Sequence, residues 1–487
     1  MLAIGGGRVN SCQVYPPARG NTLDTPASRR EEHPSVAQRK SQPFGYGSDV
    51  VGIGLAAGEG RRSRPLTLKA KGYLRSKGAI RLLGQRLMDW IIKTLVGEGV
   101  YHYIMVTKGK ENRYQVKRLL GYGESLGIQV RYSHTRFDKL DRGSADATLL
   151  NMEQFDVRTP TFVFPTDSIL EVDVPGLLEQ HESRESIATI LTFDVRAEDA
   201  IGKYGVIVTD DDGRVTEFVE KPSAEEAEEL IQRTGSDVFL TNAGFYMLDA
   251  GACREVAGCS EIRRMRERSL DFGKDFLPWL AHNGYPIHTR PIGKVGDLGN
   301  IPAYLETMLR VLRGEFPKAD AQLGYCYSRD RRIWIEPETL GAVDEWTGKT
   351  LEERIESGEV TLGRHVRIGK YVQIASGVHL DECNVDDECE VYADARISRS
   401  SIGEGSIIGP AAEIEDCVCG VMADVQSSKS SPTHLSGYSA IGDEAVVRAG
   451  VMLQDGVMVY PRVKVPRGCY CPPGAELTTS DDVMEWL

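Results

Sequence analysis

The chain has 487 residues, which is more than a single hydrophobic core usually organises, so its length predicts two folded domains. Its 58 Lys and Arg residues against 71 Asp and Glu residues give a formal charge of −13, which argues against a nucleic-acid-binding surface. No apolar run approaches the roughly 18 residues of a membrane-spanning helix. Glycines also interrupt the first residues before they could form a signal peptide. We therefore expect a cytoplasmic protein without membrane or nucleic-acid partners.

Residues 1–48 are rich in Gly, Pro, Ser and Arg and show no apolar periodicity. Ordering such a segment would bury too little apolar surface to offset the entropy lost, so we expect a flexible tail. A start codon assigned too early would explain the same composition, and the sequence does not separate the two explanations.

From residue 49 onward, short apolar runs alternate with longer amphipathic ones. This alternation predicts strands followed by helices, and hence parallel crossover units in a doubly wound, Rossmann-like sheet over residues 49–315. Ligands of such sheets bind beyond the carboxyl ends of the strands. The predicted strands are 50–58, 101–109, 128–134, 161–170, 187–195 and 242–249, the predicted helices are 85–99, 111–127, 146–155 and 174–186, and a hairpin is predicted at 204–222.

The last third of the chain has a different period, because aliphatic residues recur every six positions there. A period of six fits neither a helix nor a half-buried strand, but it fits a parallel β-helix in which each flat side points one residue inward. We expect this domain at residues 359–475, between a linker at 316–358 and a tail at 476–487. The repeating positions are Leu362, Ile368, Ile374, Leu380, Val385, Val391, Ile397, Ile402, Ile408, Ile414, Ile441, Val447, Leu453, Val459 and Val465.

The ten cysteines are scattered along the chain. Two close pairs, Cys417 with Cys419 and Cys469 with Cys471, lack the second half that a four-ligand zinc site needs. We expect reduced, packed thiols.

A loop with small residues follows the first predicted strand and reads LAAGEGRRSRPLT from Leu55 to Thr67. Glycines let the backbone approach a triphosphate closely, so that consecutive amides can donate to its oxygens. Gly58 and Gly60 alone would favour an ordinary tight turn. The basic residues nearby favour a phosphate site, because nucleotidyl transfer needs cations on the α-phosphate and on the departing pyrophosphate. These residues are Arg61, Arg62, Arg64, Lys69, Lys71 and Lys77.

This loop resembles the opening signature of the sugar-1-phosphate nucleotidylyltransferases, a family in which a left-handed parallel β-helix can follow the catalytic domain. The resemblance implies that Arg62 contacts the pyrophosphate and that Leu55, Ala56, Gly58 and Gly60 line the triphosphate cradle. The family's catalytic lysine is expected at Lys77 rather than Lys71. Lys77 precedes Asp89 by twelve residues in SKGAIRLLGQRLMDW, which is the family spacing.

Two aspartates are the predicted metal ligands. Asp167 ends the apolar strand FVFPTD, and Mg²⁺ is usually held by one or two carboxylates together with nucleotide phosphates. Asp297 in GKVGDLGNIPAY matches the second aspartate of the family. Some neighbours of the motifs are atypical, namely Arg61, Ser63, Thr166 and Val295.

The remaining motifs follow in the family's order over roughly 250 residues, and this collinearity is the specific signal. The resemblance implies that Gly205, Glu220, Lys221 and Asn242 bind the sugar phosphate, where the glutamate accepts from hydroxyls and the lysine neutralises phosphate. In RGSADA, Gly143, Ser144 and Asp146 are expected to bind the base and ribose.

The expected reaction is in-line attack by an oxygen of a hexose 1-phosphate, glucose or mannose by preference, on the α-phosphorus of a nucleoside triphosphate, with Mg²⁺ as cofactor. The identity of the base stays open, because RGSADA and SKGAI favour adenine whereas NAGFY favours thymine or guanine. One alternative is a non-catalytic regulatory subunit, as the atypical neighbours suggest. Another is a bifunctional enzyme in which His434, in a segment like that of β-helix acetyltransferases, acts as a base. The β-helix is expected to mediate homo-oligomer contacts.

Overall fold

The structure is a computed structural model that describes residues 43–68, 74–137, 143–345 and 347–484. Lys69, Lys71 and Arg142, which belong to predicted motifs, lie outside these ranges. The first described residues pack against the domain although the sequence suggested a tail as far as residue 48. The amide of Phe44 donates to the carbonyl of Phe155 at 3.1 Å, and its ring meets that of His102 edge-on.

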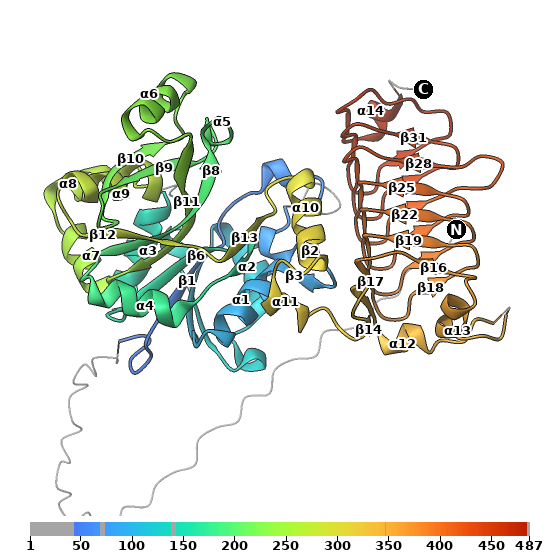
Figure 1. The fold of residues 1–487 in the computed structure, drawn as a ribbon, viewed down its shortest axis with the longest axis horizontal. Helices are drawn as coiled ribbons and strands as arrows, with labels where there is room; N and C mark the ends of the chain where they lie inside the picture. Colours follow the sequence, from blue (N-terminus) through green and yellow to red (C-terminus); the bar gives the residue numbers. More distant parts are fainter. Residues whose placement is uncertain (1–42, 69–73, 138–142, 346, 485–487) are drawn as a thin grey trace, which may run out of the picture. The chain divides into compact units, whose positions relative to one another are not determined.

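The first domain is built on a mixed sheet with the strand order β10-β9-β11-β6-β1-β4-β5, to which β8 and β12 are added beside β11 (Figure 1). Strands β1, β4, β5 and β6 run parallel, whereas β11 pairs antiparallel to β6 and β8. The predicted Rossmann-like α/β fold is confirmed. The strands are β1 (Val51–Leu55), β4 (His102–Val106), β5 (Gln129–Tyr132), β6 (Thr161–Pro165), β8 (Ala188–Arg196), β9 (Gly205–Thr209), β10 (Val215–Glu220), β11 (Val238–Leu248) and β12 (Ile287–Pro291).

Helices cover both faces of this sheet because alternate strand residues are apolar on both sides. Ile53 and Val163 face a core that contains α3, α7 and α9, whereas Tyr103 and Phe164 face a core that contains α1, α2 and α4. The helices are α1 (Leu87–Gly97), α2 (Gly109–Leu120), α3 (Ser144–Gln154), α4 (Val174–Ser183), α5 (Ala197–Ala200), α6 (Ala224–Thr234), α7 (Ala250–Ala257), α8 (Ser260–Arg266), α9 (Leu277–His282) and α10 (Ile301–Leu312).

Glycines in the central strand β1 make room for large side chains of β4. A Cβ atom at Gly52 would lie 2.7 Å from the ring of Tyr103, and one at Gly54 would lie 2.6 Å from Met105. Both glycines are paired in register with these residues. The large side chains on this face of the sheet therefore come from β4, and β1 has glycines where they pack.

The predicted strand 161–170 is interrupted in the structure. Strand β6 ends at Pro165, and the chain then leaves the main sheet to form β7 (Ser168–Glu171), which pairs antiparallel with β13 (Lys294–Asp297). The segment lacks the continuous apolar run of a single strand, because the polar pair Thr166 and Asp167 separates two apolar runs. This interruption places Asp167 just beyond the carboxyl end of β6, an interior strand of the sheet.

The second domain is a parallel β-helix, as predicted. Its strands form three stacked sheets, one of nine strands (β14-β15-β17-β20-β23-β26-β29-β32-β34) and two of six strands each (Figure 1). All of the fifteen hexad positions named above belong to one buried apolar cluster. The paired strands are β16 (Thr361–Leu362), β17 (Val366–Ile368), β18 (Gln373–Ile374), β19 (His379–Asp381), β20 (Asn384–Val385), β21 (Glu390–Val391), β22 (Arg396–Ser398), β23 (Ser401–Ile402), β24 (Ile407–Ile408), β25 (Glu413–Glu415), β26 (Val418–Cys419), β27 (Asp424–Val425), β28 (His434–Leu435), β29 (Ala440–Ile441), β30 (Val446–Val447), β31 (Met452–Leu453), β32 (Met458–Val459) and β33 (Lys464–Val465).

The nine-stranded sheet extends beyond the predicted limits of the β-helix. Strands β14 (Cys326–Ser328) and β15 (Ile333–Ile335) come from the segment expected as a linker, and β34 (Glu476–Leu477) comes from the segment expected as a tail. Short helices also lie in these segments, namely α11 (Pro317–Asp320), α12 (Pro337–Leu340), α13 (Leu351–Glu356) and α14 (Ser480–Met484). None of the helices in the described ranges has the length and apolar character needed to cross a membrane.

Candidate active site

A cavity of about 610 Å³ lies at the carboxyl ends of β1, β4 and β6. This is the place where an open α/β sheet binds its ligands. The cavity is lined by several of the predicted residues, which come from segments far apart in the sequence. Those residues are Leu55, Ala56, Gly58, Lys77, Gly143, Ser144 and Asp167.

The loop after β1 is held in shape by its own backbone. Gly60 adopts the left-handed conformation, with φ of 64°, and a Cβ atom there would lie 2.6 Å from the Thr67 side chain and 2.9 Å from that of Lys77. The Thr67 hydroxyl donates to the Gly60 carbonyl at 2.8 Å. Gly60 therefore allows the chain to turn beside Lys77. It is not among the residues that line the cavity.

Lys77 begins a short 3-10 helix, η3 (Lys77–Ala79). A side chain of α2 holds the residues that precede this helix. The side chain of the buried Gln115 accepts from the amide of Ser76 at 2.8 Å and donates to the carbonyl of Leu74 at 2.7 Å. The Lys77 ammonium then reaches the carboxylate of Asp167, with 2.5 Å between Nζ and Oδ2. The predicted lysine and the predicted metal ligand are thus in direct contact.

The second aspartate is brought to the first by strand pairing. Asp297 is the register partner of Ser168, the residue directly after Asp167. Gly296 permits the close approach of α10, because a Cβ atom there would lie 2.4 Å from Thr307, and the Thr307 hydroxyl donates to the Asp297 carbonyl at 2.8 Å. The β7–β13 ladder therefore brings together two segments whose aspartates are 130 residues apart in the sequence.

The donor chemistry of this pair fits a hard divalent cation. Two carboxylates on adjacent strands supply oxygen ligands, and nucleotide phosphates and water would complete the shell of such an ion. Asp297 is exposed, and one of its oxygens accepts from the amide of Gly299 at 3.0 Å, which orients the carboxylate while leaving the other oxygen for a ligand. Asp167 and Asp297 are the residues that could hold the metal.

Three of the atypical residues have a structural role at this site. The buried Ser63 donates to the carbonyl of Leu298 at 3.1 Å, which ties the phosphate loop to the strand that carries Asp297. Thr166 is buried and directs its hydroxyl to the carbonyl of Leu55, 3.4 Å away. Val295 packs against the core beneath β7. These substitutions are accommodated by the fold without removing the charged residues.

Arg62 lies apart from the residues that line the cavity, and its guanidinium is exposed. Its charge acts on the phenol of Tyr204. The pKa of Tyr204 is raised, first by burial and then by the Asp297 carboxylate, while Arg62 opposes the increase. Arg62 therefore belongs to the side of the site that contains Asp297 and Tyr204, whereas its neighbour Arg61 lines the cavity.

Asp146 is placed differently from the sequence expectation. Its side chain is fully buried and pairs with Arg266, with 2.5 Å between Oδ1 and Nε, and it does not line the cavity. Gly143 has φ of 82° and allows the carbonyl of Leu270 to lie where a Cβ atom would stand. That carbonyl accepts from the amides of Ala145 and Asp146. The first amides of α3 are thus bound by the Leu270 carbonyl. Of the three residues predicted to bind base and ribose, Gly143 and Ser144 line the cavity and Asp146 does not.

The predicted sugar residues meet at the start of the β9–β10 ladder. Glu220 is the register partner of Gly205, and the amide of Lys221 donates to the carbonyl of Tyr204 at 3.1 Å. Cβ atoms at Gly205 and Gly273 would lie 2.7 Å and 2.6 Å from the Glu220 carboxylate. Burial raises the pKa of Glu220, and the Lys221 ammonium, 3.8 Å away, opposes this shift.

Asn242 has both ends of its amide engaged within its own strand. It donates to the Tyr246 hydroxyl at 3.0 Å and accepts from the amide of Gly244 at 2.9 Å. The ring of Tyr246 stacks on Phe272, which follows the cavity residue Asp271. Asn242 is thus linked to the segment that carries Asp271 indirectly, through Tyr246 and Phe272.

Several cavity residues were missed by the sequence reasoning. Lys108 follows β4 directly, so the rule that drew attention to Asp167 would also have found it. The side chain of Asn112 accepts from the amide of Lys108 and donates to the carbonyl of Ala56, which fixes two cavity loops to each other. Asp271 accepts from the Ser144 hydroxyl at 2.9 Å, and no local pattern marks it. Of the other lining residues, Arg61 was named above in the basic cluster and Thr166 as an atypical neighbour. The missed lining residues are Ala57, Glu59, Val106, Thr107, Lys108, Ser133, Ala147, Leu150, Asn151 and Asp271.

His434 lies in β28 of the β-helix, in register with Glu413 and Met452 on the neighbouring strands. Its Nδ1 is 2.9 Å from the Glu413 carboxylate, and its side chain is partly exposed. A carboxylate on one ring nitrogen orients the imidazole, as a general base requires. Acetyl transfer stays a prediction, which acetyl-coenzyme A turnover by the wild type and by His434→Ala would test.

Asp146→Ala is expected to destabilise the protein by about 3 kcal/mol, because it removes the buried carboxylate partner of the largely buried Arg266. Chemical denaturation measures this loss. The control is Glu153→Gln, which removes the exposed partner of the same arginine and should cost less than about 1 kcal/mol. If Asp146→Ala kept full stability but weakened nucleotide binding, the carboxylate would act as the sequence suggested.

The comparisons with known proteins agree with this geometry. The family described as nucleotidyl transferase matches residues 51–314. The chain is 26% identical to a glucose-1-phosphate adenylyltransferase of Thermus thermophilus over 66% of its own length and 80% of that protein. It is 27% identical to a UTP–glucose-1-phosphate uridylyltransferase of Synechocystis, over 54% of this chain and 63% of that one. It is 28% identical to a glucose-1-phosphate adenylyltransferase of Aliivibrio fischeri, over 55% and 68%. The chain belongs to the nucleotidyl transferase family.

Proposed function

We propose that this protein joins a nucleoside triphosphate to glucose 1-phosphate and releases pyrophosphate. The observation that carries the proposal is the contact of Lys77 with Asp167 at a cavity of about 610 Å³, together with the pairing of Asp297 with Ser168, the residue after Asp167. The names of the relatives support glucose 1-phosphate as the sugar phosphate and ATP or UTP as the nucleotide.

The proposed reaction is a direct displacement at the α-phosphorus. An oxygen of the sugar phosphate forms the new P–O bond, the bond between the α-phosphorus and the bridging oxygen breaks, and pyrophosphate departs with the electron pair. The attacking phosphate is already ionised, so no residue has to remove a proton. The protein contributes by positioning the reactants and by neutralising charge that shifts to the phosphate oxygens.

Each charged residue has a distinct role in this proposal. Lys77 presents its ammonium from the loop side, where it would neutralise the α-phosphate, and Arg61 lies nearer the triphosphate cradle than Arg62. Asp167 and Asp297 would hold the metal, for which we propose Mg²⁺. When bound, this ion supplies positive charge to the phosphate oxygens. Glu220 and Lys221 would bind the hydroxyls and the phosphate of the sugar.

The alternative of a non-catalytic regulatory subunit rested on the atypical motif residues. The contacts of Ser63 and Thr166 with backbone carbonyls explain two of these residues as parts of the fold. Lys77, Asp167 and Asp297 are retained; Lys77 contacts Asp167, and Asp297 is paired in register with Ser168, the residue after Asp167. The geometry therefore favours the enzyme.

We also infer self-association through the β-helix, which exposes large apolar side chains along its strands and turns. Ile407, Met422, Met452 and Tyr470 are examples, and a second copy would remove such surface from water. Sedimentation equilibrium at micromolar concentration should give a mass above that of one chain. A single-chain mass across this range would contradict the inference.

The activity is tested by measuring pyrophosphate release for four nucleoside triphosphates with glucose, mannose, galactose and glucosamine phosphates in the presence of Mg²⁺. We expect turnover of ATP or UTP with glucose 1-phosphate. Asp297→Asn and Lys77→Met should each lower kcat about 100-fold, because each removes preorganised charge around the reacting phosphates. Glu217→Gln, which alters an exposed ion pair on β10, is the control and should keep kcat. Absence of turnover in every combination would favour the regulatory subunit.

The pH dependence of sugar binding should depend on Glu220. Its pKa is raised, so its carboxylate accepts a proton, and loses its role as acceptor, at a higher pH than an ordinary glutamate does. Loss of hydrogen bonds to a charged group corresponds to roughly 10- to 100-fold in kcat/KM. The ratio of kcat/KM between wild type and Glu220→Gln for glucose 1-phosphate should fall toward one as the pH is lowered. Both proteins act on the same substrate, so protonation of glucose 1-phosphate changes both values of kcat/KM equally and cancels in their ratio. A ratio that does not change with pH would remove Glu220 from the sugar site.

A further inference from the structure

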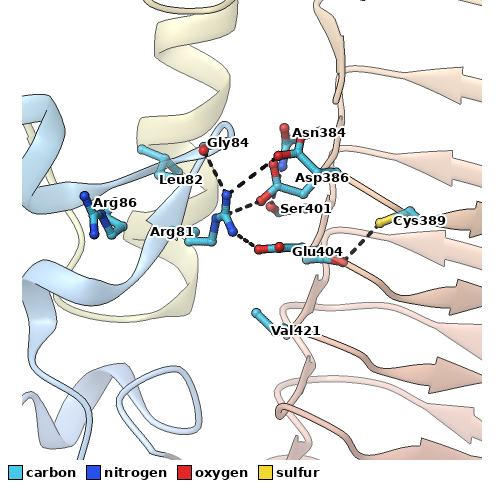
Figure 2. A network of polar contacts seen from close by, with 12 residues as sticks. Arg81, Leu82, Gly84, Arg86, Asn384, Asp386, Cys389, Ser401, Glu404 and Val421 are labelled. Atoms are coloured by element: carbon cyan, nitrogen blue, oxygen red, sulfur yellow. Dashed lines mark hydrogen bonds and ion pairs between the residues drawn. The ribbon is translucent and has the colours of Figure 1, made fainter. Parts of the chain in front are cut away.

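Arginines on both sides of Lys77 reach the β-helix. Arg75 precedes the lysine by two residues and forms an ion pair with Asp443. Arg81 follows it by four residues, at the start of the hairpin β2 (Arg81–Leu82) and β3 (Gln85–Arg86), and forms an ion pair with Glu404. Arg81 also lies 3.5 Å from the Asp386 carboxylate. Figure 2 shows its guanidinium between the hairpin and the turns of the β-helix.

The partners of these arginines stand in a row. Asp386, Glu404 and Asp443 each follow a strand of the nine-stranded sheet, namely β20, β23 and β29, which lie along one run of that sheet. A regular β-helix repeats its turns at the same edge, so the three carboxylates are carried on a single rigid edge. The row therefore offers fixed anchor points to a segment of the other domain.

The anchor points are themselves held in place. One oxygen of Asp443 accepts from the amide of Val421 at 3.0 Å, and the other oxygen pairs with Arg75. Asp386 is almost fully buried and is bound by Arg367 at 3.0 Å. Burial raises the pKa of Asp386, and Arg367 and Arg81 oppose that shift. Ion pairs in such surroundings are screened far less than exposed ones, so they are strong constraints on geometry.

The hairpin after Lys77 is shaped to fit this edge. A Cβ atom at Gly84 would overlap the Arg367 guanidinium, which approaches to 2.0 Å of that position, and Arg81 donates to the Gly84 carbonyl at 3.2 Å. Beside these polar contacts, Leu82 and Leu83 share one apolar cluster with Val418 and Ala440 of the β-helix. The segment that carries Lys77 is thus fixed at both ends by the second domain.

We propose that Arg75 and Arg81 are positioning residues, through which the β-helix holds the Lys77 ammonium at the reacting phosphates. The role of Lys77 rests on the proposed function. The consequence is that the nucleotidyl transferase domain needs the β-helix for the geometry of its catalytic lysine. Loss of either tether frees one end of a short segment and spreads the ammonium over several positions, which lowers the rate of the chemical step.

The test uses the full-length chain with Arg75→Met and Asp443→Asn, each of which removes one half of a tether. We expect kcat to fall at least 10-fold in both variants, while KM for glucose 1-phosphate changes less than 2-fold. The exchanged pair Arg75→Asp with Asp443→Arg should recover kcat to within about 3-fold of wild type. The matched control is Arg313→Met, which breaks another ion pair between the domains, that of Arg313 with Glu382, and should leave kcat unchanged.

Hydrogen–deuterium exchange gives a readout that does not depend on activity. The amides of Ala79 and Ile80 are hydrogen-bonded to the carbonyls of Ser76 and Lys77, so peptides covering residues 76–83 report directly on the tethered segment. Their exchange should become at least 5-fold faster in Arg75→Met and in Asp443→Asn, but not in Arg313→Met. Unchanged exchange, or an equal fall of kcat in the control, would overturn the proposal. A wild type that exchanges as predicted but releases no pyrophosphate would instead contradict the proposed function alone.

Discussion

The contact between Lys77 and Asp167 is the constraint on which the rest of the site depends. This contact joins the segment after the phosphate loop with a carboxylate that follows β6. The two residues are 90 positions apart in the sequence. The β7–β13 ladder pairs Asp297 with Ser168, the residue after Asp167, and two carboxylates that share a site need positive charge nearby. Lys77 supplies that charge in the protein alone, and a divalent cation would supply it together with the nucleotide. In the proposed function, the metal would therefore take the place of the Lys77 ammonium beside Asp167 when the substrates bind.

The atypical residues of the motifs become intelligible once their contacts are known. Ser63 uses its hydroxyl to connect the phosphate loop to the strand of Asp297, a connection that a leucine could not make by hydrogen bonding. Thr166 is buried against β1 and directs its hydroxyl to a strand carbonyl. These residues add hydrogen bonds between segments that must keep a fixed distance. They are better explained as parts of a rigid frame than as signs of lost activity.

The fold could be predicted from the sequence because it rests on local periodicity. The site could be predicted only where its residues belong to motifs that follow the family's order. The six-residue repeat specified the β-helix, and all of its marked aliphatic residues are buried in one cluster. Lys77 and Asp167 were predicted from separate motifs and lie in contact, while their roles in catalysis stay predictions. Asp146 illustrates the limit, because an aspartate in the first turn of a helix looks exposed until its partner, Arg266, is brought in from 120 residues away. Asp271 and the arginine tethers depend in the same way on tertiary packing, which no local pattern records.

A crystal structure with Mn²⁺ and a non-hydrolysable nucleoside triphosphate would test the central claim most directly, because anomalous scattering locates the metal without reference to the protein density. The account predicts that Mn²⁺ lies between the carboxylates of Asp167 and Asp297 and that the Lys77 ammonium has moved from Asp167 to the α-phosphate. A metal bound elsewhere, or Lys77 still paired with Asp167 beside a bound nucleotide, would contradict it.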